Sequence, residues 1–361
     1  MSQSRLRWQD YVLERGDDAV DMVSAAAEAS ASTAFILGLG FDPRMLVGLR
    51  RIGPTLKSRL SVVAVDLSGT GAGQVADLHG ARNRDELAQL VSSWGAELVT
   101  QVLPPTSDRR RSGLRLAQQL SRDLKADHIV VDISALPKSV YFPLIASWLR
   151  RVDERPQSLQ LQVVVTENPA LDDVIHGEGT LPPSHFGGFQ HGLNLEAVPS
   201  GPRVWSPVLG PCAVTQLEVI HERLKPTEIC PVLPFPARNP RRGDDLLIEH
   251  RKLLVDTFEV EASNYIYANE ANPFDLYRTL SRLHLRYREA LRPLGEATVV
   301  LSTHASKVLS IGVLLAAYEH ALPVVTAGPA KHVVDSPEKF GELADADVLT
   351  CLWLHGEPYN I

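Results

Sequence analysis

The sequence predicts an α/β protein made of two tandem Rossmann-like domains, each with a parallel sheet, related by a pseudo-two-fold internal duplication. The chain has 361 residues, more than a single hydrophobic core usually supports. Short apolar runs alternate with helical patterns along most of its length, as expected for parallel strands joined by crossover helices. Two loop motifs also recur at nearly the same separation. These three observations predict the fold class.

The first 30 residues place apolar side chains near helical spacing and end in an alanine-rich stretch, so we expect an N-terminal helical segment over 1–30. The first Rossmann-like domain is then expected over 31–200. The run 128–133 is almost entirely β-branched or apolar, which is typical of a strand buried on both faces. In chain order we expect strands at 34–37, 61–67, 97–103, 128–133 and 160–165, with helices at 45–56, 83–95, 113–125 and 140–152.

A connector rich in Gly, Pro, His and Asn, from 166 to 203, contains the boundary between the two domains. The second domain, over 201–361, repeats the alternation of the first. We expect its strands at 204–209, 228–233, 263–267 and 297–301, with two closing strands at 322–327 and 348–354, and its helices at 213–224, 244–257, 273–288 and 307–320.

The composition limits the classes of function. With 44% hydrophobic and 22% charged residues the chain is globular, and a net charge of -7 gives no general basic field for duplex nucleic acid. Its three cysteines, without CxxC spacing, indicate neither a disulfide framework nor a zinc site. No apolar leader and no membrane-length apolar run is present, so we expect a cytoplasmic protein with no membrane contact.

The duplication rests on two pairs of landmarks. Gly40 and Gly210 each follow the first strand of a domain, and Lys138 and Lys307 each begin a late apolar helix. The separation within the glycine pair exceeds that within the lysine pair by only one position. Ligands of open α/β sheets bind outside the carboxyl ends of the strands, where helix N-termini attract anions. Because both lysines add a cation there, we expect a nucleotide-type ligand in a cleft between the two halves.

These loops resemble the CRISPR-associated Rossmann-fold (CARF) domains, and two such units in one chain resemble the SAVED domains of antiphage systems. The resemblance implies a sensor of cyclic oligonucleotides in a prokaryotic defence system, with a separate effector or partner protein. In place of the family's glycine pair before the lysine, this chain has Leu136-Pro137 and Ala305-Ser306. The implied ligand-binding residues are Gly38, Gly40, Arg44, Ser134 and Lys138 in the first half, and Gly210, Thr215, Thr303, His304 and Lys307 in the second.

Two other classes of function stay open. An enzyme acting on a nucleotide or phosphorylated metabolite could use His304 or Asp132 near the bond that breaks, and a scaffold or partner subunit could retain a degenerate pocket. No cofactor is expected, because Pro43 occupies the position of the third glycine in the dinucleotide fingerprint.

Other residue clusters are expected to be structural or remain undecided. His176, His185 and His191 of the connector have no metal-ligand spacing, which favours a flexible loop. Phosphate contact and solvation are equally compatible with the arginines at 109–111 and 241–242, which follow expected strand ends.

Overall fold

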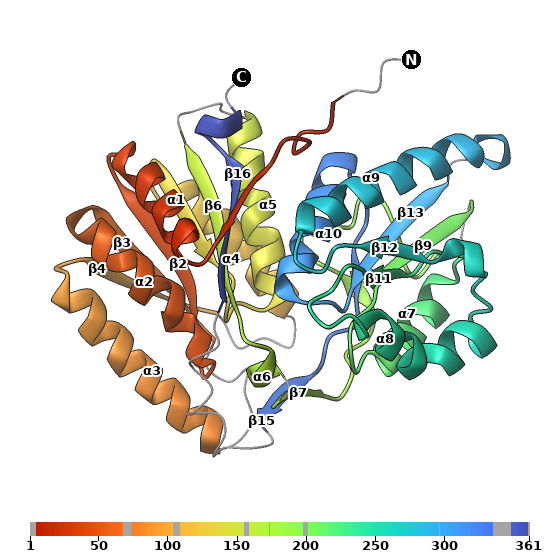
Figure 1. Ribbon diagram of the computed structural model, residues 1–361, viewed down its shortest axis with the longest axis horizontal. Helices are drawn as coiled ribbons and strands as arrows, with labels where there is room; N and C mark the ends of the chain where they lie inside the picture. Colours follow the sequence, from red (N-terminus) through yellow and green to blue (C-terminus); the bar gives the residue numbers. More distant parts are fainter. Residues whose placement is uncertain are drawn as a thin grey trace. The chain divides into compact units, whose positions relative to one another are not determined.

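The computed structural model describes residues 5–67, 74–103, 109–154, 159–172, 174–197, 201–295, 297–334 and 348–359. It divides into two compact units, each with helices and a mostly parallel sheet, as predicted (Figure 1). Unit 1 comprises Met1–Asp10 and Thr180–Gly328, and unit 2 comprises Tyr11–Gly179 and Pro329–Ile361. Unit 1 is therefore largely an insertion between two parts of unit 2. No helix in the described residues has both the length and the apolar character needed to cross a membrane.

Unit 2 has a seven-stranded sheet in the order β1-β16-β6-β5-β2-β3-β4. The five strands expected between 31 and 200 are all present and run parallel to one another. The strands are β1 (Val12–Arg15), β2 (Thr33–Leu39), β3 (Leu60–Asp66), β4 (Glu97–Val102), β5 (His128–Asp132), β6 (Gln160–Glu167) and β16 (Val348–His355).

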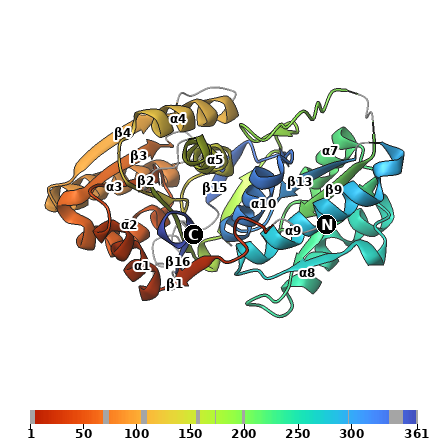
Figure 2. The same ribbon diagram turned by 90° about the horizontal axis from the view of Figure 1, so that it is seen from above.

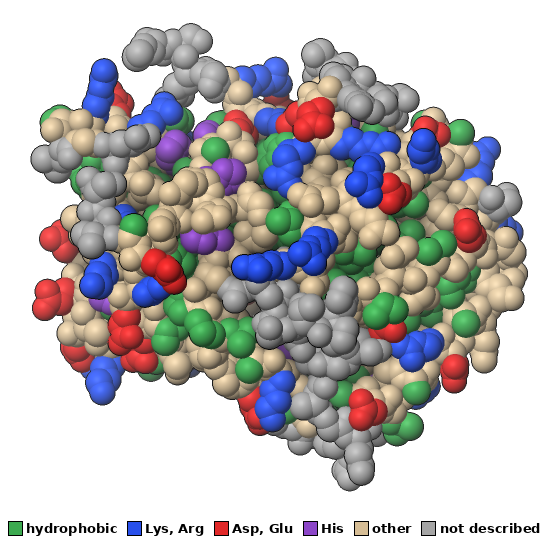
Figure 3. Space-filling view, turned by 180° about the vertical axis from the view of Figure 1, so that it is seen from behind, with side chains coloured by type: hydrophobic (Ala, Val, Ile, Leu, Met, Phe, Trp, Pro, Cys, Tyr) green, Lys and Arg blue, Asp and Glu red, His purple; other side chains and the backbone are tan. Residues whose placement is uncertain are grey.

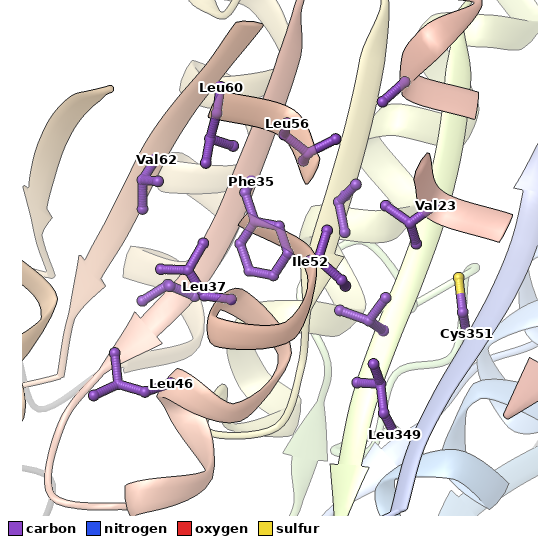
Figure 4. Close-up of a cluster of buried hydrophobic side chains, with 14 of the residues drawn as sticks. Val23, Phe35, Leu37, Leu46, Ile52, Leu56, Leu60, Val62, Leu349 and Cys351 are labelled. Atoms are coloured by element: carbon purple, nitrogen blue, oxygen red, sulfur yellow. The ribbon is translucent and has the colours of Figure 1, made fainter. Parts of the chain in front are cut away.

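Helices cover both faces of this sheet. Figure 2 shows α1, α2 and α3 on one face and α4 and α5 on the other. The core beneath the first face packs Phe35 and Leu37 of β2 against Val62, Ile52 and Val23 (Figure 4). The helices are α1 (Asp17–Glu28), α2 (Val47–Leu56), α3 (Gln74–Ser93), α4 (Arg109–Asp123) and α5 (Lys138–Glu154), and the 3-10 turn η1 (Pro43–Leu46) precedes α2.

The two ends of the chain depart from the sequence prediction. The strand β16, expected to close the second domain, pairs antiparallel with β6 of unit 2. There it covers what would otherwise be an exposed sheet edge, and its central residues are buried. The segment 1–30 is only partly helical, because β1 forms within it and pairs with β16. The expected division at residue 200 therefore differs from the observed units.

Unit 1 has a second parallel sheet in which β9 (Arg203–Val208) is central. On one side of β9 lie β10 (Glu228–Ile229) and β11 (Val232–Pro234), followed by β12 (Ile266–Ala268). Pro231 has no N–H for the ladder, which accounts for the break between β10 and β11. On the other side β13 (Thr298–Thr303) pairs with β9, and Val324 forms a parallel bridge with Leu301.

The helices of unit 1 follow the strands as predicted. Side chains of α7 (Val214–Leu224) and α8 (Arg242–Arg251) form a core with Trp205 of β9, and α8 continues into a π-helical segment, Lys252–Thr257. The helices α9 (Pro273–Ala290) and α10 (Lys307–His320) pack against each other.

The connector between the predicted domains is more ordered than expected. It contains α6 (Pro169–Asp172), β7 (Ile175–Glu178) and β8 (Ser184–His185). In unit 2, β7 pairs with β15 (Lys331–Val334), and in unit 1, β8 pairs with β14 (Val325–Thr326).

Candidate functional site

In unit 1 the carboxyl ends of four parallel strands lead directly into the N-termini of helices. The strands β9, β11, β12 and β13 are followed by α7, α8, α9 and α10, respectively. This edge of a parallel sheet is where open α/β proteins bind ligands. It carries the five residues predicted in the second half of the chain, Gly210, Thr215, Thr303, His304 and Lys307.

The loops after β9 and β13 pack directly on each other. A Cβ on Gly210 would overlap the carbonyl oxygen of His304, and it would lie 3.0 Å from the backbone nitrogen of Ala305. The His304 N–H donates to the Val208 carbonyl oxygen at 2.9 Å, which continues the β-ladder into the loop. Glycine is thus required at position 210 because backbone occupies the space of a side chain.

His304 also contacts the helix that follows β9. Its Nδ1 lies 3.1 Å from Oε1 of Gln216, in the first turn of α7, and its ring is half-buried. Thr215 precedes Gln216 and is exposed, and Lys307 is the first residue of α10 and half-buried. His304, Thr215 and Lys307 therefore lie on the loops or helix starts at this edge, as predicted.

Thr303 does not fit the predicted role. Its side chain is buried, and its Oγ1 is 2.8 Å from the hydroxyl of Ser310 inside α10. This contact links the end of β13 to the following helix, so we assign Thr303 a structural role.

The helix N-termini at this edge differ in how they are capped. The Ser306 hydroxyl accepts a hydrogen bond from the N–H of Leu309 in α10, and the Asn272 side chain accepts from two N–H groups of α9. The N-cap of α7 is Ala213, which offers no side-chain oxygen. The helix α8 also lacks a side-chain cap, but its first turn carries two acidic residues, whereas the first turn of α7 carries none. Of these four helices, α7 therefore has the first turn that best suits an anion.

Two side chains of α8 reach the turn before α7, and no pattern in the sequence indicated either of them. Glu249 Oε1 accepts from the N–H of Cys212 at 2.6 Å, and the buried His250 places Nε2 2.9 Å from the carbonyl oxygen of Gly210. Both residues lie in an ordinary amphipathic helix, where charged residues usually face solvent. A carboxylate thus already occupies one amide beside the N-terminus of α7.

In unit 2 the predicted cation Arg44 is part of a buried ion-pair cluster. Its guanidinium contacts Asp42 at 2.8 Å and Asp172 at 2.6 Å, and only 6% of Arg44 is exposed. Burial alone would lower the pKa of Arg44, but the two carboxylates raise it above its ordinary value. Arg44 therefore joins η1 to α6, and its charge is compensated within unit 2.

The other residues predicted in the first half divide into buried and accessible ones. Gly38 lies inside β2, where a Cβ would be 3.0 Å from Leu67 and Leu136 side-chain atoms, and the buried Ser134 hydroxyl accepts from the Thr166 N–H. Gly40 and Lys138 are half-buried, and Lys138 begins α5 as expected. Of this set, only Gly40 and Lys138 remain accessible for ligand contact.

The secondary candidates take mostly structural positions. His176 and His185 lie in β7 and β8, and the described residues contain no group of three or more metal-ligating side chains. Arg241 and Arg242 lie at the start of α8, each 3.9 Å from a carboxylate, Asp245 and Glu270 respectively. The side chains of the arginines at 109 and 110 lie outside the described residues.

No protein-family model matches the chain, and no curated protein matches it. Among solved structures it is similar to the U34-tRNA thiolase NcsA from Methanococcus maripaludis, with 10% identity over 39% of this chain and 52% of that chain, and a TM-score of 0.23. It is also similar to an uncharacterised protein from Mycobacterium paratuberculosis, with 12% identity over 82% of this chain and 80% of that chain, and a TM-score of 0.22. Likenesses this weak support no conclusion about fold or function.

Proposed function

We propose that this chain is a sensor that binds a nucleotide-type ligand at the carboxyl ends of the strands of unit 1. The observation that carries the proposal is the N-terminus of α7, which has no side-chain cap and lies beside the loop that holds His304 and leads to Lys307. A phosphate there would accept hydrogen bonds from first-turn amides, and Lys307 and His304 would add a cation and a polar group.

A phosphate-bearing ligand would need a local site of positive potential, because the net charge of the chain is negative. On the face in Figure 3 the described basic and acidic side chains are interspersed. The chain carries a net charge of -7, so a phosphate would be attracted by helix amides and a few nearby cations. Base or sugar contacts would then supply specificity.

We further propose that the two units are related by duplication. When the parallel strands of each unit are numbered along the chain, both sheets have the same spatial order: third, second, first, fourth, fifth. Val324 is taken here as the fifth position of unit 1. The pairing of Thr33 with His128 in unit 2 recurs in unit 1 as the pairing of Arg203 with Thr298. The interval from Thr33 to Arg203 equals the interval from His128 to Thr298, and both equal the interval that separates Gly40 from Gly210. This agreement supports a common origin of the two units. That the two loop sets share one cleft stays a prediction.

The resemblance to CARF and SAVED domains makes a cyclic oligonucleotide the first ligand to test, and a separate effector the partner that it implies. Isothermal titration of the full chain with cyclic oligonucleotides, mononucleotides, dinucleotides and inorganic phosphate tests the site. We expect one class to bind, and Lys307→Ala to weaken its binding at least tenfold. Lys225→Ala removes an exposed lysine at the opposite end of α7 and should leave the affinity unchanged.

The same titration decides between the proposal and its rivals. If no nucleotide binds, or if Lys307→Ala and Lys225→Ala behave alike, the proposed site is wrong. If chromatography shows a product and His304→Ala abolishes it, the chain is an enzyme rather than a simple sensor.

One observation favours a second candidate, a partner subunit with a degenerate pocket. In unit 2 the loop cation Arg44 is neutralised by Asp42 and Asp172, and Ser134 is buried. A chain that binds no nucleotide but binds a neighbouring gene product, unaffected by Lys307→Ala, would support this candidate.

A further inference from the structure

An exposed apolar strip follows one edge of the sheet in unit 1. The described part of the chain has seven large hydrophobic side chains that are exposed, and four of them lie on α8, its π-helical extension, β12 or the residue after β11. They are Phe235 (63% exposed), Ile248 (69%), Val255 (50%) and Tyr267 (55%). Such a concentration on one surface usually marks an interface.

These side chains form one continuous surface. The rings of Phe235 and Tyr267 meet edge to face, with centroids 6.1 Å apart. Tyr265 lies two residues before Tyr267 in extended backbone, so both rings lie on the same side of the chain. Tyr265, Ile248 and Val255 line an open apolar groove of about 310 Å3, together with Leu247, Leu254 and Arg251.

The backbone beside this strip can accept another strand. Among the described strands, β12 ends the sheet, with β11 as its neighbour. The Ile266 N–H donates to Pro231, and the Ala268 carbonyl accepts from Phe235, so both groups face β11. Because successive residues of a strand alternate, the N–H and C=O of Tyr267 point outward from the sheet edge.

The charges around the groove favour a copy of the same surface over a uniformly acidic or basic partner. Arg251 and Lys252 are exposed there, and the exposed carboxylates of Asp256, Glu259 and Glu261 follow shortly after them in the chain. None of these five forms an ion pair within the described residues. A two-fold axis places such a mixed surface against a rotated copy of itself, so that basic residues of one copy can pair with acidic residues of the other.

We propose that a second copy of this chain docks on this strip, with the two β12 strands paired antiparallel about a two-fold axis. The apolar groove residues would then pack across the axis, and Tyr267 would exchange backbone hydrogen bonds with its counterpart.

Analytical ultracentrifugation of the full chain over a wide concentration range tests the proposal. Tyr267→Pro removes the outward N–H without touching the ladder to β11, and Ile248→Asp places a charge in the strip. We expect a wild-type dimer, and dissociation constants raised at least tenfold in both variants. Val102→Asp, at an exposed apolar position on the edge strand β4 of unit 2, is the matched control and should dimerise like wild type.

Circular dichroism and thermal unfolding must first show that each variant is folded. A wild type that stays monomeric at every concentration overturns the proposal and indicates a different protein as the occupant. If the chain dimerises and neither variant weakens the dimer, the interface lies on another surface, and the proposal is also overturned. If Ile248→Asp weakens the dimer and Tyr267→Pro does not, the apolar contact is supported and the strand pairing is wrong.

Discussion

Gly210 lies against the carbonyl oxygen of His304, so that a methyl group at position 210 would overlap the backbone of the loop after β13. The carbonyl oxygen and carbon of His304 belong to the main chain, which the hydrogen bond from the His304 N–H to Val208 holds in place, so neither atom can rotate away. We expect Gly210→Ala to lower the free energy of unfolding by about 2–4 kcal/mol, the size typical of severe overpacking. Urea denaturation followed by tryptophan fluorescence measures the change.

The matched control is Gly40→Ala, at the corresponding loop of unit 2. There the nearest atom to a new Cβ is the Leu67 Cβ at 3.6 Å, an ordinary van der Waals distance. We expect a change of at most about 0.5 kcal/mol at this position. Equal effects of the two substitutions would show that the close packing of the Gly210 loop is absent in solution.

The cluster around Arg44 gives a second prediction. Arg44→Ala leaves Asp42 largely buried with its compensating charge removed, so we expect a loss of about 3–5 kcal/mol in the free energy of unfolding. Arg51→Ala breaks an ion pair with the fully exposed Asp17 and should cost less than about 1 kcal/mol. If Arg44→Ala is as stable as Arg51→Ala but loses ligand affinity, Arg44 is a ligand contact after all.

The buried parallel strands were predictable because their sequences are locally distinctive. The run 128–133 and the strand after the connector are nearly continuous apolar segments, and each precedes a turn and a helix. The place of β16 was not predictable in this way. Its sequence is that of any buried strand, and the larger segment of unit 1, Thr180–Gly328, lies between it and its partner β6 in the chain, so no local pattern identifies the pairing.

The candidate site was predictable only where the fold itself positions a residue. Lys138 and Lys307 begin helices because each follows a strand and a short loop, and this order is visible in the sequence. The role of Arg44 depends on Asp172, which lies far along the chain. The contact of Glu249 with Cys212 joins the last turn of α8 to the turn before α7. Such contacts arise from tertiary packing, which residue spacing does not encode.

The buried His128 predicts acid sensitivity in unit 2. Burial lowers the pKa of His128 from 6.5 to about 4, although its hydrogen bond with Gln162 opposes this shift. The unfolded chain, with the ordinary pKa, binds the proton more readily than the folded chain between these two values. The free energy of unfolding should therefore fall as the pH falls from about 6.5 to about 4, by up to about 3 kcal/mol from this residue.

The substitution His128→Gln removes the titrating group and keeps a polar side chain beside Thr33 and Gln162. Urea denaturation of wild type and variant at several pH values between 7 and 4 isolates its contribution. We expect wild type to be the more stable protein at pH 7 and its advantage to shrink as the solution is acidified. An advantage that is constant over this range would show that His128 does not titrate with a lowered pKa.

The carboxylate of Glu249 beside the N-terminus of α7 gives a prediction specific to the proposed ligand site. It accepts from the Cys212 N–H at 2.6 Å and would repel an incoming phosphate. Glu249→Gln keeps an acceptor for that N–H but removes the charge, so we expect affinity for a phosphate-bearing ligand to rise about fivefold or more at low salt. Isothermal titration measures the change, and added salt should reduce it.

Glu222→Gln is the matched control, because it removes an exposed carboxylate from the last turns of α7, remote from its N-terminus. A ligand whose binding is strengthened by Glu249→Gln and unchanged by Glu222→Gln must lie near the Cys212 turn, since screened charge effects fall off within about 10 Å. If the ligand binds wild type and both variants equally, it binds at another place in the chain. That result would move the ligand site away from α7 while leaving the chain a nucleotide-binding protein.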